Sequence, residues 1–448
     1  MTVASPEPAG VAFETGPEPA EGNYFVAAYP PFSAWRAELA PRVHDALGRP
    51  MAAATAAPFG IYVHVPFCAR RCHYCYYLSY AGRSGREIEA YVEGVLRELE
   101  LYRAAPGLAG RRPGFVYFGG GTPSLLPTRA IRRLIAGMKS AFPWDEVEEA
   151  TFECAPRSVT PGKMVELREA GINRVSVGVQ QLDDEVLRLN GRVHMTADVE
   201  RACEAVRTAR FDEVNLDLMV GLVGETDESF RASLERVIGM GPDSVTLYPL
   251  EIPRNTPLFR SLRDGAAGPR PASWEVKRAR LAWAFERLEA AGYALRSAYA
   301  AARGARHRRF VYQEEQYRGA DLLGLGVSSF SYVAGVHYQN HPALEPYLAC
   351  VRSNRLPIRR AYVLDDRERL VREFILQLKL GRVGTDRFRR KFGVEVAERF
   401  VEPLRWFAAR GWLVCDPHEI RLTRKGLLRT DRLLPAFYLP EHRRLGYS

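Results

Sequence analysis

Short apolar runs alternate with longer amphipathic stretches from about residue 60 to about residue 300. The apolar runs have the length of buried strands and the amphipathic stretches have the spacing of surface helices, so the pattern predicts consecutive βαβ units around a parallel sheet. The predicted strands are residues 61–65, 115–118, 150–152, 174–177, 214–218 and 244–247. The predicted helices are residues 87–102, 128–141, 161–170, 197–209, 228–240 and 274–291. Six strands, each followed by a helix, predict a barrel or an open partial barrel.

Polar or glycine-rich residues stand at the end of each predicted strand. The carboxyl ends of parallel strands face one mouth of a β/α sheet, where active sites form. Taken singly, each of these residues has a structural alternative, such as capping a helix or pairing with an arginine. Together they predict one site, built from residues 68–75 and 119–124 and from Glu153, Gln180, Asp217 and Tyr248.

Three cysteines, Cys68, Cys72 and Cys75, lie in one short loop directly after the first predicted strand. A structural zinc site needs four ligands, and the nearby sequence offers no fourth Cys or His at zinc-finger spacing. A [4Fe-4S] cluster held by three thiolates leaves one iron open to a further ligand. The loop therefore predicts a reactive iron–sulfur centre. Zinc remains the alternative through His73, although its place beside a cysteine would strain a tetrahedral site.

A run of three glycines, residues 119–121, follows the second predicted strand. Glycine has no Cβ, so the backbone of such a run can approach a ligand closely. The surrounding sequence matches neither the P-loop nor the dinucleotide-binding fingerprint. We therefore expect a ligand contact here rather than a turn needed only for chain reversal.

The 448 residues include 63 Lys and Arg against 53 Asp and Glu, a formal net charge of +10. This excess would suit an anionic small-molecule substrate, but the sequence has no basic tract with interleaved aromatics, so we expect no nucleic-acid partner. No apolar stretch reaches the roughly 18 residues that cross a bilayer, so we expect no membrane partner. Residues 1–22 have the composition of a disordered leader, and the cysteine usage favours a reducing compartment, so we expect a cytoplasmic protein.

The loop C-x3-C-x2-C resembles the signature of radical S-adenosylmethionine (SAM) enzymes, and the further motifs resemble their oxygen-independent coproporphyrinogen III oxidase-like family. The resemblance runs from about residue 23 to residue 438 and is carried by residues 62–68, 117–124, 171–180, 191–194, 215–218 and 321–328. It implies an α/β fold: a radical SAM partial (β/α)6 barrel with a C-terminal helical, winged-helix-like domain. The implied domains are a leader plus N-terminal arm at 1–58, the barrel at 59–298, an extension covering the active site at 299–363 and the C-terminal domain at 364–448.

The resemblance also implies the cofactors and their residues. Cys68, Cys72 and Cys75 would hold a [4Fe-4S] cluster, and SAM on the open iron would be cleaved to a 5′-deoxyadenosyl radical that abstracts hydrogen. A protein such as flavodoxin or ferredoxin would donate the electron. The implied contacts of the first SAM are Gly120, Gly121, Thr122, Glu153, Gln180, Arg192 and Asp217. The implied contacts of a second SAM are Tyr74, Tyr312 and Gln313, and the catalytic candidates are Tyr62, His64 and Tyr77.

Two features bear on the reaction. Tyr77 stands where the oxidase carries a further cysteine, which speaks against porphyrinogen decarboxylation. Residues 23–35 are similar in character to the oxidase's N-terminal arm, which weakens a haem-chaperone function. We therefore expect a radical SAM methyltransferase or cyclopropanase, in which one SAM forms the radical and another donates a one-carbon unit to a small-molecule biosynthetic intermediate. The alternatives are an oxygen-independent coproporphyrinogen III oxidase and a haem chaperone.

Overall fold

The computed structural model describes residues 25–50, 57–265, 268–304 and 309–445. The predicted leader, residues 1–22, lies outside these ranges. Within them, no helix combines the length and the apolar character that crossing a membrane requires.

A twelve-stranded sheet forms the centre of the molecule, in the order β14-β13-β12-β11-β1-β4-β5-β6-β7-β8-β10-β9. The strands from β11 through β8 run parallel to one another, and the remaining strands pair antiparallel at the two edges. The parallel strands are β1 (Phe59–Val65), β4 (Phe115–Gly120), β5 (Glu149–Cys154), β6 (Arg174–Gln180), β7 (Glu213–Val220), β8 (Ser244–Pro249) and β11 (Asp321–Leu325). The antiparallel strands are β9 (Ala294–Leu295), β10 (Ala300–Ala302), β12 (Phe330–Val333), β13 (Val336–Asn340) and β14 (Ile358–Val363). The six predicted strands are β1 and β4 to β8, adjacent and in chain order, which confirms the predicted partial barrel.

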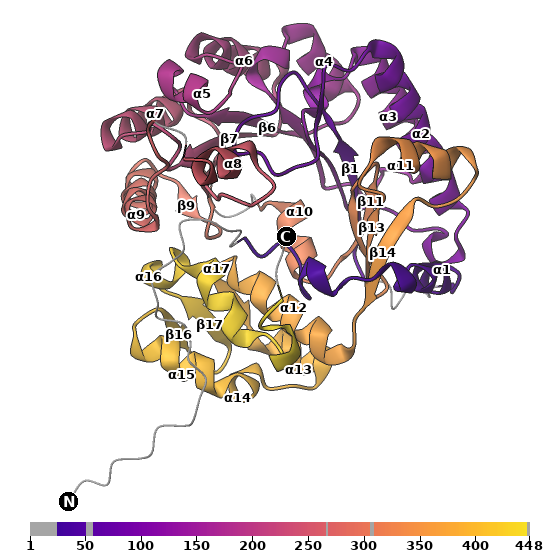
Figure 1. The fold of residues 1–448 in the computed structure, drawn as a ribbon. Helices are drawn as coiled ribbons and strands as arrows, with labels where there is room; N and C mark the ends of the chain where they lie inside the picture. The colour runs from indigo at the N-terminus through magenta and orange to yellow at the C-terminus, as the bar shows by residue number, and fades with distance from the viewer. Residues whose placement is uncertain (1–24, 51–56, 266–267, 305–308, 446–448) are drawn as a thin grey trace, which may run out of the picture.

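Helices cover the outer face of this curved sheet (Figure 1). The predicted helices are confirmed as α2 (Gly85–Arg103), α3 (Thr128–Ala141), α4 (Pro161–Glu169), α6 (Thr196–Ala209), α7 (Asp227–Met240) and α9 (Trp274–Ala290). Their starts follow ordinary capping chemistry, as where the Ser84 hydroxyl and the Glu87 carboxylate cap each other's backbone at α2. Shorter helices add α1 (Pro41–Leu47), α5 (Asp184–Leu189), α8 (Pro257–Arg263), α10 (Val311–Tyr317) and α11 (Leu344–Arg352).

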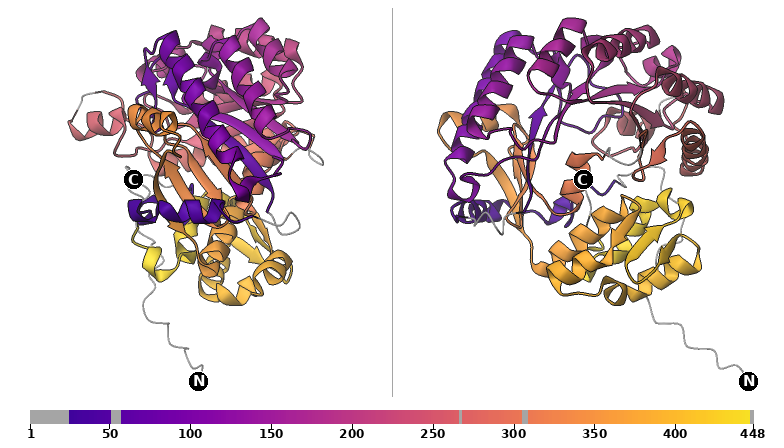
Figure 2. Two further views of the ribbon diagram at one scale, coloured as in Figure 1. Left: turned by 90° about the vertical axis from the view of Figure 1, so that its right-hand side faces the viewer. Right: turned by 180° about the vertical axis from the view of Figure 1, so that it is seen from behind.

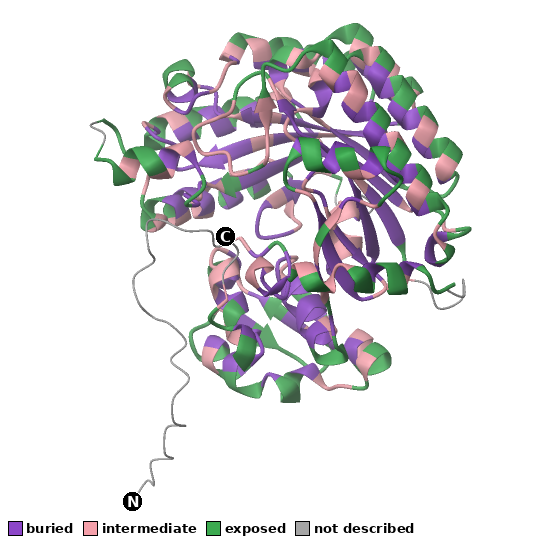
Figure 3. Ribbon diagram, turned by 45° about the vertical axis from the view of Figure 1, so that its right-hand side comes forward, coloured by how far each residue is buried: buried purple, intermediate pink, exposed green. Residues whose placement is uncertain are grey.

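Burial is greatest along the strands. Figure 3 shows the sheet almost entirely buried, with exposed residues gathered on the outer faces of the helices. The central strands are buried on both faces, because helices cover one face and side chains fill part of the barrel on the other. This core fixes the positions of the strand ends, where the predicted site residues stand.

The segment predicted as an extension over the active site, residues 299–363, extends the barrel sheet. Its strand β11 pairs in parallel with β1, with Phe59 opposite Asp321, and β12 to β14 continue from β11 as an antiparallel meander. Strand β1 is therefore internal to the sheet rather than its first edge. Helix α10 of this segment lies beside β4, where Tyr312 stacks on Tyr117 with ring centroids 4.2 Å apart.

The C-terminal part folds as a helical unit with a small sheet of its own, ordered β15-β17-β16. An aromatic core around Phe374 holds it together, with Phe400 and Phe437 at ring-centroid distances of 4.5 and 5.0 Å. This unit lies across the open side of the barrel (Figures 1 and 2). Its elements are α12 (Asp366–Leu378), β15 (Arg382–Gly384), α13 (Thr385–Phe392), α14 (Val396–Arg399), α15 (Val401–Ala409), β16 (Leu413–Cys415), β17 (Glu419–Leu422), α16 (Arg424–Leu427) and α17 (Thr430–Leu433).

Candidate active site

One cavity of about 1530 Å³ lies between the barrel, the N-terminal arm and the C-terminal unit. Its lining includes every residue predicted for the cluster, the two SAM molecules and the chemistry, although the individual roles stay predictions. These residues are Tyr62, His64, Cys68, Cys72, Tyr74, Cys75, Tyr77, Gly120, Gly121, Thr122, Glu153, Gln180, Arg192, Asp217, Tyr312 and Gln313. The fold therefore brings the ends of the parallel strands together at one cavity, as predicted.

The cysteine loop is held in shape by hydrogen bonds to its backbone and sulfurs. The Cys75 N–H donates to the Cys72 carbonyl oxygen at 3.2 Å, and Arg71 Nη2 donates to the Cys75 carbonyl oxygen at 2.9 Å. Two predicted SAM-site residues reach the thiols: Thr122 Oγ1 lies 3.5 Å from Cys68 Sγ, and Arg192 Nη1 lies 3.2 Å from Cys72 Sγ. The loop and the predicted SAM site are thus one continuous structure.

The thiols have the chemistry of cluster ligands. Burial raises the pKa of Cys75 to about 12, and the neighbouring Cys72 raises it further. Burial likewise raises the pKa of Cys68. Such thiols become thiolates when a bound metal centre stabilises the negative charge, and soft thiolate ligands suit an iron–sulfur cluster. The donor set therefore fits the predicted cluster.

His73, the residue behind the zinc alternative, is engaged elsewhere. Its Nδ1 lies 3.1 Å from the Leu189 carbonyl oxygen. Its ring lies so close to Gly191 that a Cβ there would come within 2.7 Å of the imidazole. This imidazole therefore anchors the cysteine loop to the segment after α5.

The glycine run at the end of β4 is required by close contacts with other parts of the protein. Gly120 has φ +112°, and a Cβ on it would lie 2.5 Å from the His64 ring. A Cβ on Gly121 would lie 2.8 Å from the Phe67 carbonyl oxygen, just before the first cysteine. The run thus fixes the cysteine loop against β4, and it also lines the cavity.

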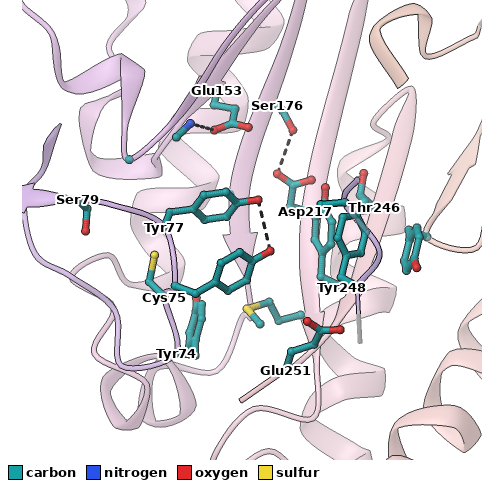
Figure 4. A pocket seen from close by; sticks show the side chains of 18 of the residues that line it. Tyr74, Cys75, Tyr77, Ser79, Glu153, Ser176, Asp217, Thr246, Tyr248 and Glu251 are labelled. Carbon is teal, nitrogen blue, oxygen red and sulfur yellow. Dashed lines mark hydrogen bonds between the residues drawn. The ribbon is translucent and has the colours of Figure 1, made fainter. Parts of the chain in front are cut away.

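Two carboxyl groups face the cavity from β5 and β7 (Figure 4). Glu153 accepts hydrogen bonds from the Tyr117 hydroxyl at 2.7 Å and the Gly120 N–H at 3.1 Å, and burial raises its pKa to about 7. Asp217 accepts from Ser176 at 3.0 Å and Asn215 at 2.7 Å, and burial raises its pKa to about 6. Both carboxyl groups are held in fixed orientation and suit hydroxyl or ammonium donors of a ligand.

Gln180 and Arg192 stand beside each other in the fold. Gln180 ends β6 in the left-handed region with φ +67°, at an irregularity in its pairing with β7. Such a conformation is rare in residues other than glycine, and the few examples are concentrated at functional sites. The Arg192 guanidinium donates to the Gly178 carbonyl oxygen at 3.0 Å, and its buried Nε has no hydrogen-bond partner. A polar ligand in the cavity would satisfy such a donor.

Aromatic rings form much of the remaining wall. Tyr117 stacks on Tyr62 and Tyr312 at ring-centroid distances of 6.0 and 4.2 Å. Burial lowers the pKa of His64 to about 4, so this imidazole is neutral, and its Nδ1 lies 3.3 Å from the Tyr62 hydroxyl oxygen. Tyr77 projects into the cavity, where it is 48% exposed. Tyr77 therefore offers a hydroxyl to a ligand, where the oxidase resemblance implied a cysteine.

Sequence reasoning gave no role to several residues of the wall. Tyr117 falls within a motif that carried the resemblance, but only the structure shows its hydroxyl on Glu153. Ser176, which orients Asp217, is a polar residue within an apolar strand run, and that exception was a usable signal. Arg372 and Tyr332 come from segments without a motif and meet the cavity through long-range packing alone.

Comparison with known proteins agrees with this geometry. The radical SAM superfamily model matches residues 62–237, and the HemN C-terminal domain model matches residues 364–429. The oxygen-independent coproporphyrinogen III oxidase of Pseudomonas aeruginosa is 30% identical over 414 residues, covering 87% of this chain and 88% of that protein. The heme chaperone HemW of Bacillus subtilis is 26% identical over 381 residues, covering 84% of this chain and 98% of that protein.

The solved structure of the coproporphyrinogen III oxidase HemN from Escherichia coli, described as a radical SAM enzyme, matches with a TM-score of 0.80 and 25% identity. The match covers 92% of this chain and 96% of that one. The superfamily uses a [4Fe-4S] cluster and SAM, the cofactors expected from the cysteine loop. The chain is therefore a radical SAM enzyme of the HemN family, which includes oxygen-independent coproporphyrinogen III oxidases and heme chaperones.

Proposed function

We propose that the chain catalyses radical oxidative decarboxylation of a carboxylate-bearing tetrapyrrole of the coproporphyrinogen III type. The relatives reported above are named as an oxidase and a heme chaperone. They lend no support to methyl or cyclopropane transfer, the function first expected from the sequence. The observation that carries the proposal is the large, basic cavity that opens onto the cysteine loop.

The size and charge of this cavity suit such a substrate. Its volume of about 1530 Å³ exceeds the range of roughly 300–1,000 Å³ usual for small-ligand pockets, which leaves room for a tetrapyrrole beside SAM. Ten Lys and Arg residues line it against four Asp and Glu. Guanidinium groups are suited to binding carboxylates, and coproporphyrinogen III carries several propionates.

The residues of the site would divide the work between binding and exclusion of water. When bound, the cluster and SAM supply the hydrogen-abstracting 5′-deoxyadenosyl radical. Thr122 and Arg192, which already contact the thiols, would orient SAM next to the cluster, and Glu153 and Asp217 would accept hydrogen bonds from its polar groups. The stacked rings of Tyr62, Tyr117 and Tyr312 would keep water from the reacting carbon.

The substrate chemistry balances in two steps. One hydrogen atom of the propionate carbon next to the pyrrole ring would be transferred to the radical that the bound cluster and SAM supply. The resulting substrate radical loses its carboxylate as carbon dioxide and gives one electron to a one-electron acceptor, which leaves a vinyl group. A second SAM near Tyr74, Tyr312 and Gln313 belongs to the proposal, as do a cytoplasmic setting and a flavodoxin or ferredoxin as electron donor.

Anaerobic turnover of the reconstituted protein tests the proposal. With SAM, dithionite, an electron acceptor and coproporphyrinogen III, we expect 5′-deoxyadenosine and a product that has lost carbon dioxide, both detected by mass spectrometry. Cys72→Ala should abolish both products. Cys203→Ala is the matched control, because Cys203 is a half-buried free thiol outside the cavity. Formation of 5′-deoxyadenosine without any loss of carbon dioxide would reject this substrate class.

One-carbon transfer is the second candidate, and Tyr77 is the observation that favours it. Its exposed ring stacks on Tyr76 at 4.6 Å and occupies the cavity beside the cysteine loop, where the oxidase resemblance implied a thiol. The same assay separates the two functions, because transfer adds carbon to the substrate mass. Stoichiometric heme binding without turnover would instead indicate a chaperone.

A further inference from the structure

A second wall of the cavity combines aromatic rings with two guanidinium groups. This arginine wall consists of Trp35 from the N-terminal arm, Tyr332 and His337 from β12 and β13, Arg360 from β14 and Arg372 from α12. The His337 ring lies 4.9 Å from that of Trp35 and 4.7 Å from that of Tyr332. The Arg372 guanidinium lies 3.9 Å above the Tyr332 ring, and the Arg360 guanidinium lies 5.8 Å above the Trp35 ring. The two charges thus flank a row of three neighbouring rings, of which Trp35 and His337 are stacked and Tyr332 is tilted.

Arg372 is an incompletely satisfied charge. Its side chain is only 4% exposed, and its Nε is buried without a hydrogen-bond partner. Its Nη1 donates a long hydrogen bond to the Gln316 carbonyl oxygen at 3.4 Å. In the part of the chain that the structure describes, no carboxylate forms an ion pair with it. A buried charge without a counter-ion is costly, and stacking on one tyrosine offsets only part of that cost.

Arg360 has similar surroundings. Its Nε donates to Gln339 Oε1 at 2.7 Å and its Nη1 to the Phe32 carbonyl oxygen at 3.0 Å, so its partners are neutral groups. Burial lowers the pKa of His337 well below its usual value, so this imidazole adds no charge to the wall. The positive charge of the wall therefore comes from two arginines whose described partners are neutral.

We infer that the arginine wall is a carboxylate subsite, in which Arg372 binds a carboxylate of the substrate while Trp35 and Tyr332 pack against its ring system. Arg360 takes a second carboxylate at the other end of the row. The inference rests on the proposed function and names the part of the cavity that recognises the substrate. Arg372 is a substrate-binding residue here, and it belongs to α12 rather than to the cysteine loop.

The stacking explains why arginine rather than lysine serves in this place. A guanidinium over an aromatic ring keeps its N–H donors in the plane parallel to the ring, where a carboxylate can accept two of them. A lysine ammonium has no such plane and binds as a point charge. Arg372→Lys should therefore recover only part of the function of the wall.

Equilibrium binding of coproporphyrin III tests the inference without turnover. This oxidised tetracarboxylate is fluorescent and is not a substrate for hydrogen abstraction at the reduced ring system. On the anaerobically reconstituted full chain, Arg372→Met should raise its Kd at least about tenfold, and Arg372→Lys should raise it less. Arg352→Gln, an exposed residue outside the cavity, is the control and should leave the Kd unchanged.

Thermal unfolding in the absence of ligand gives the second readout. If Arg372 serves binding rather than stability, Arg372→Met should have a Tm equal to or above that of the wild type, because the variant removes a buried unpaired charge. A lower Tm with an unchanged Kd would show that Arg372 only supports the fold, and would overturn the inference.

The two proposals fail in different ways. If the wild type decarboxylates coproporphyrinogen III and Arg372→Met binds coproporphyrin III as tightly as the wild type does, only the subsite is overturned. If the wild type neither binds coproporphyrin III nor releases carbon dioxide, the proposed function is overturned, and the subsite falls with it. The tetramethyl ester of coproporphyrin should bind wild type and Arg372→Met equally, because it lacks carboxylates.

Discussion

Gly121 determines the position of the first cluster cysteine. A Cβ at this position would meet the Phe67 and Val65 carbonyl oxygens at 2.8 and 2.9 Å, and backbone atoms cannot move away cheaply. We expect Gly121→Ala to destabilise the protein by about 1–3 kcal/mol and to lower its iron content by displacing Cys68. Thermal unfolding and iron analysis after reconstitution measure both effects. Gly162→Ala is the control, because Gly162 has no neighbour within 4 Å of a built Cβ; equal iron content in the two variants would contradict the expectation.

Glu153 makes stability depend on pH in a defined direction. Burial raises its pKa to about 7 in the folded protein, against about 4.3 in the unfolded chain. Burial of the ionised Glu153 carboxylate therefore lowers the free energy of unfolding. This loss is small below the pKa of the unfolded chain, grows as pH rises, and is complete above the pKa of the folded protein. We expect Glu153→Gln to stabilise the SAM-free protein by about 1–3 kcal/mol at pH 8 and by much less at pH 5.

Urea unfolding at the two pH values measures this difference. Glu166→Gln is the matched control, since this partly exposed carboxylate pairs with Arg132 and its pKa is lowered by that hydrogen bond. The control should lose rather than gain stability at pH 8. An equal gain for Glu153→Gln at both pH values would show that its ionisation does not matter to folding.

At the residue scale, the sequence predicted which strand-end residues meet at one cavity, while their individual roles stay predictions. Glu153, Gln180 and Asp217 were predicted because each stands at or near the end of an apolar run, and parallel strands bring their carboxyl ends to one edge. The glycine run was predicted to approach a ligand, whereas its closest contacts are with His64 and Phe67. The hydrophobic pattern predicts where a strand ends, but it does not identify which residues pack against the glycines there.

At the scale of elements, the six barrel strands were predictable and the seventh parallel strand was not. Strand β11 follows β1 by more than 250 residues, yet the two pair directly, from Phe59 with Asp321 to Val63 with Leu325. A local apolar pattern identifies such a strand without identifying its partner. The C-terminal helices α16 and α17 also line the cavity. Their place there depends on contacts with residues distant in the chain, which a local sequence pattern does not identify.

A buried ion pair joins three elements that are distant in the chain. Lys379 Nζ lies 3.1 Å from Asp431 Oδ1 and donates to the Val26 carbonyl oxygen at 2.9 Å. The Lys379 side chain is fully buried. The Val26 N–H donates back to Asp431 at 3.1 Å. Together these bonds hold the N-terminal arm against the C-terminal unit at the edge of the cavity.

Removing one partner of this pair should loosen the arm. We expect Lys379→Met to cost about 3–5 kcal/mol, because Asp431 stays buried without its cation. The double variant Lys379→Met/Asp431→Asn should recover a large part of that loss, since the amide keeps the acceptor for Val26. Chemical denaturation measures both variants, and Arg367→Met, at an exposed ion pair with Glu441, is the control that should cost little. A double variant as unstable as the single one would show that the packing of the lysine stem, rather than the charge, holds the arm.

At the scale of the whole molecule, three separate parts of the chain enclose one chamber. The barrel supplies the cysteine loop, the arm supplies Trp35, and the C-terminal unit supplies Arg372 and Asp431. The radical SAM model matches residues 62–237 and the HemN C-terminal domain model matches residues 364–429, while the predicted domain bounds stay predictions. The charge of the chamber was not predictable, because the net charge of +10 gives the excess of basic over acidic residues but not which of them face inward.

The charge of the chamber should govern how fast an anionic substrate enters it. Ten basic residues against four acidic ones in the lining create a positive potential, which accelerates the encounter with a tetracarboxylate and is screened by salt. We expect the association rate of coproporphyrin III, measured by stopped-flow fluorescence, to fall about tenfold between low and high ionic strength while the dissociation rate changes little. The uncharged tetramethyl ester should show no such dependence, and Arg372→Met should retain most of it, since that residue contributes one charge among ten. A salt dependence carried entirely by the dissociation rate would mean that the charges act only after docking, as short-range contacts, and that the chamber exerts no long-range attraction.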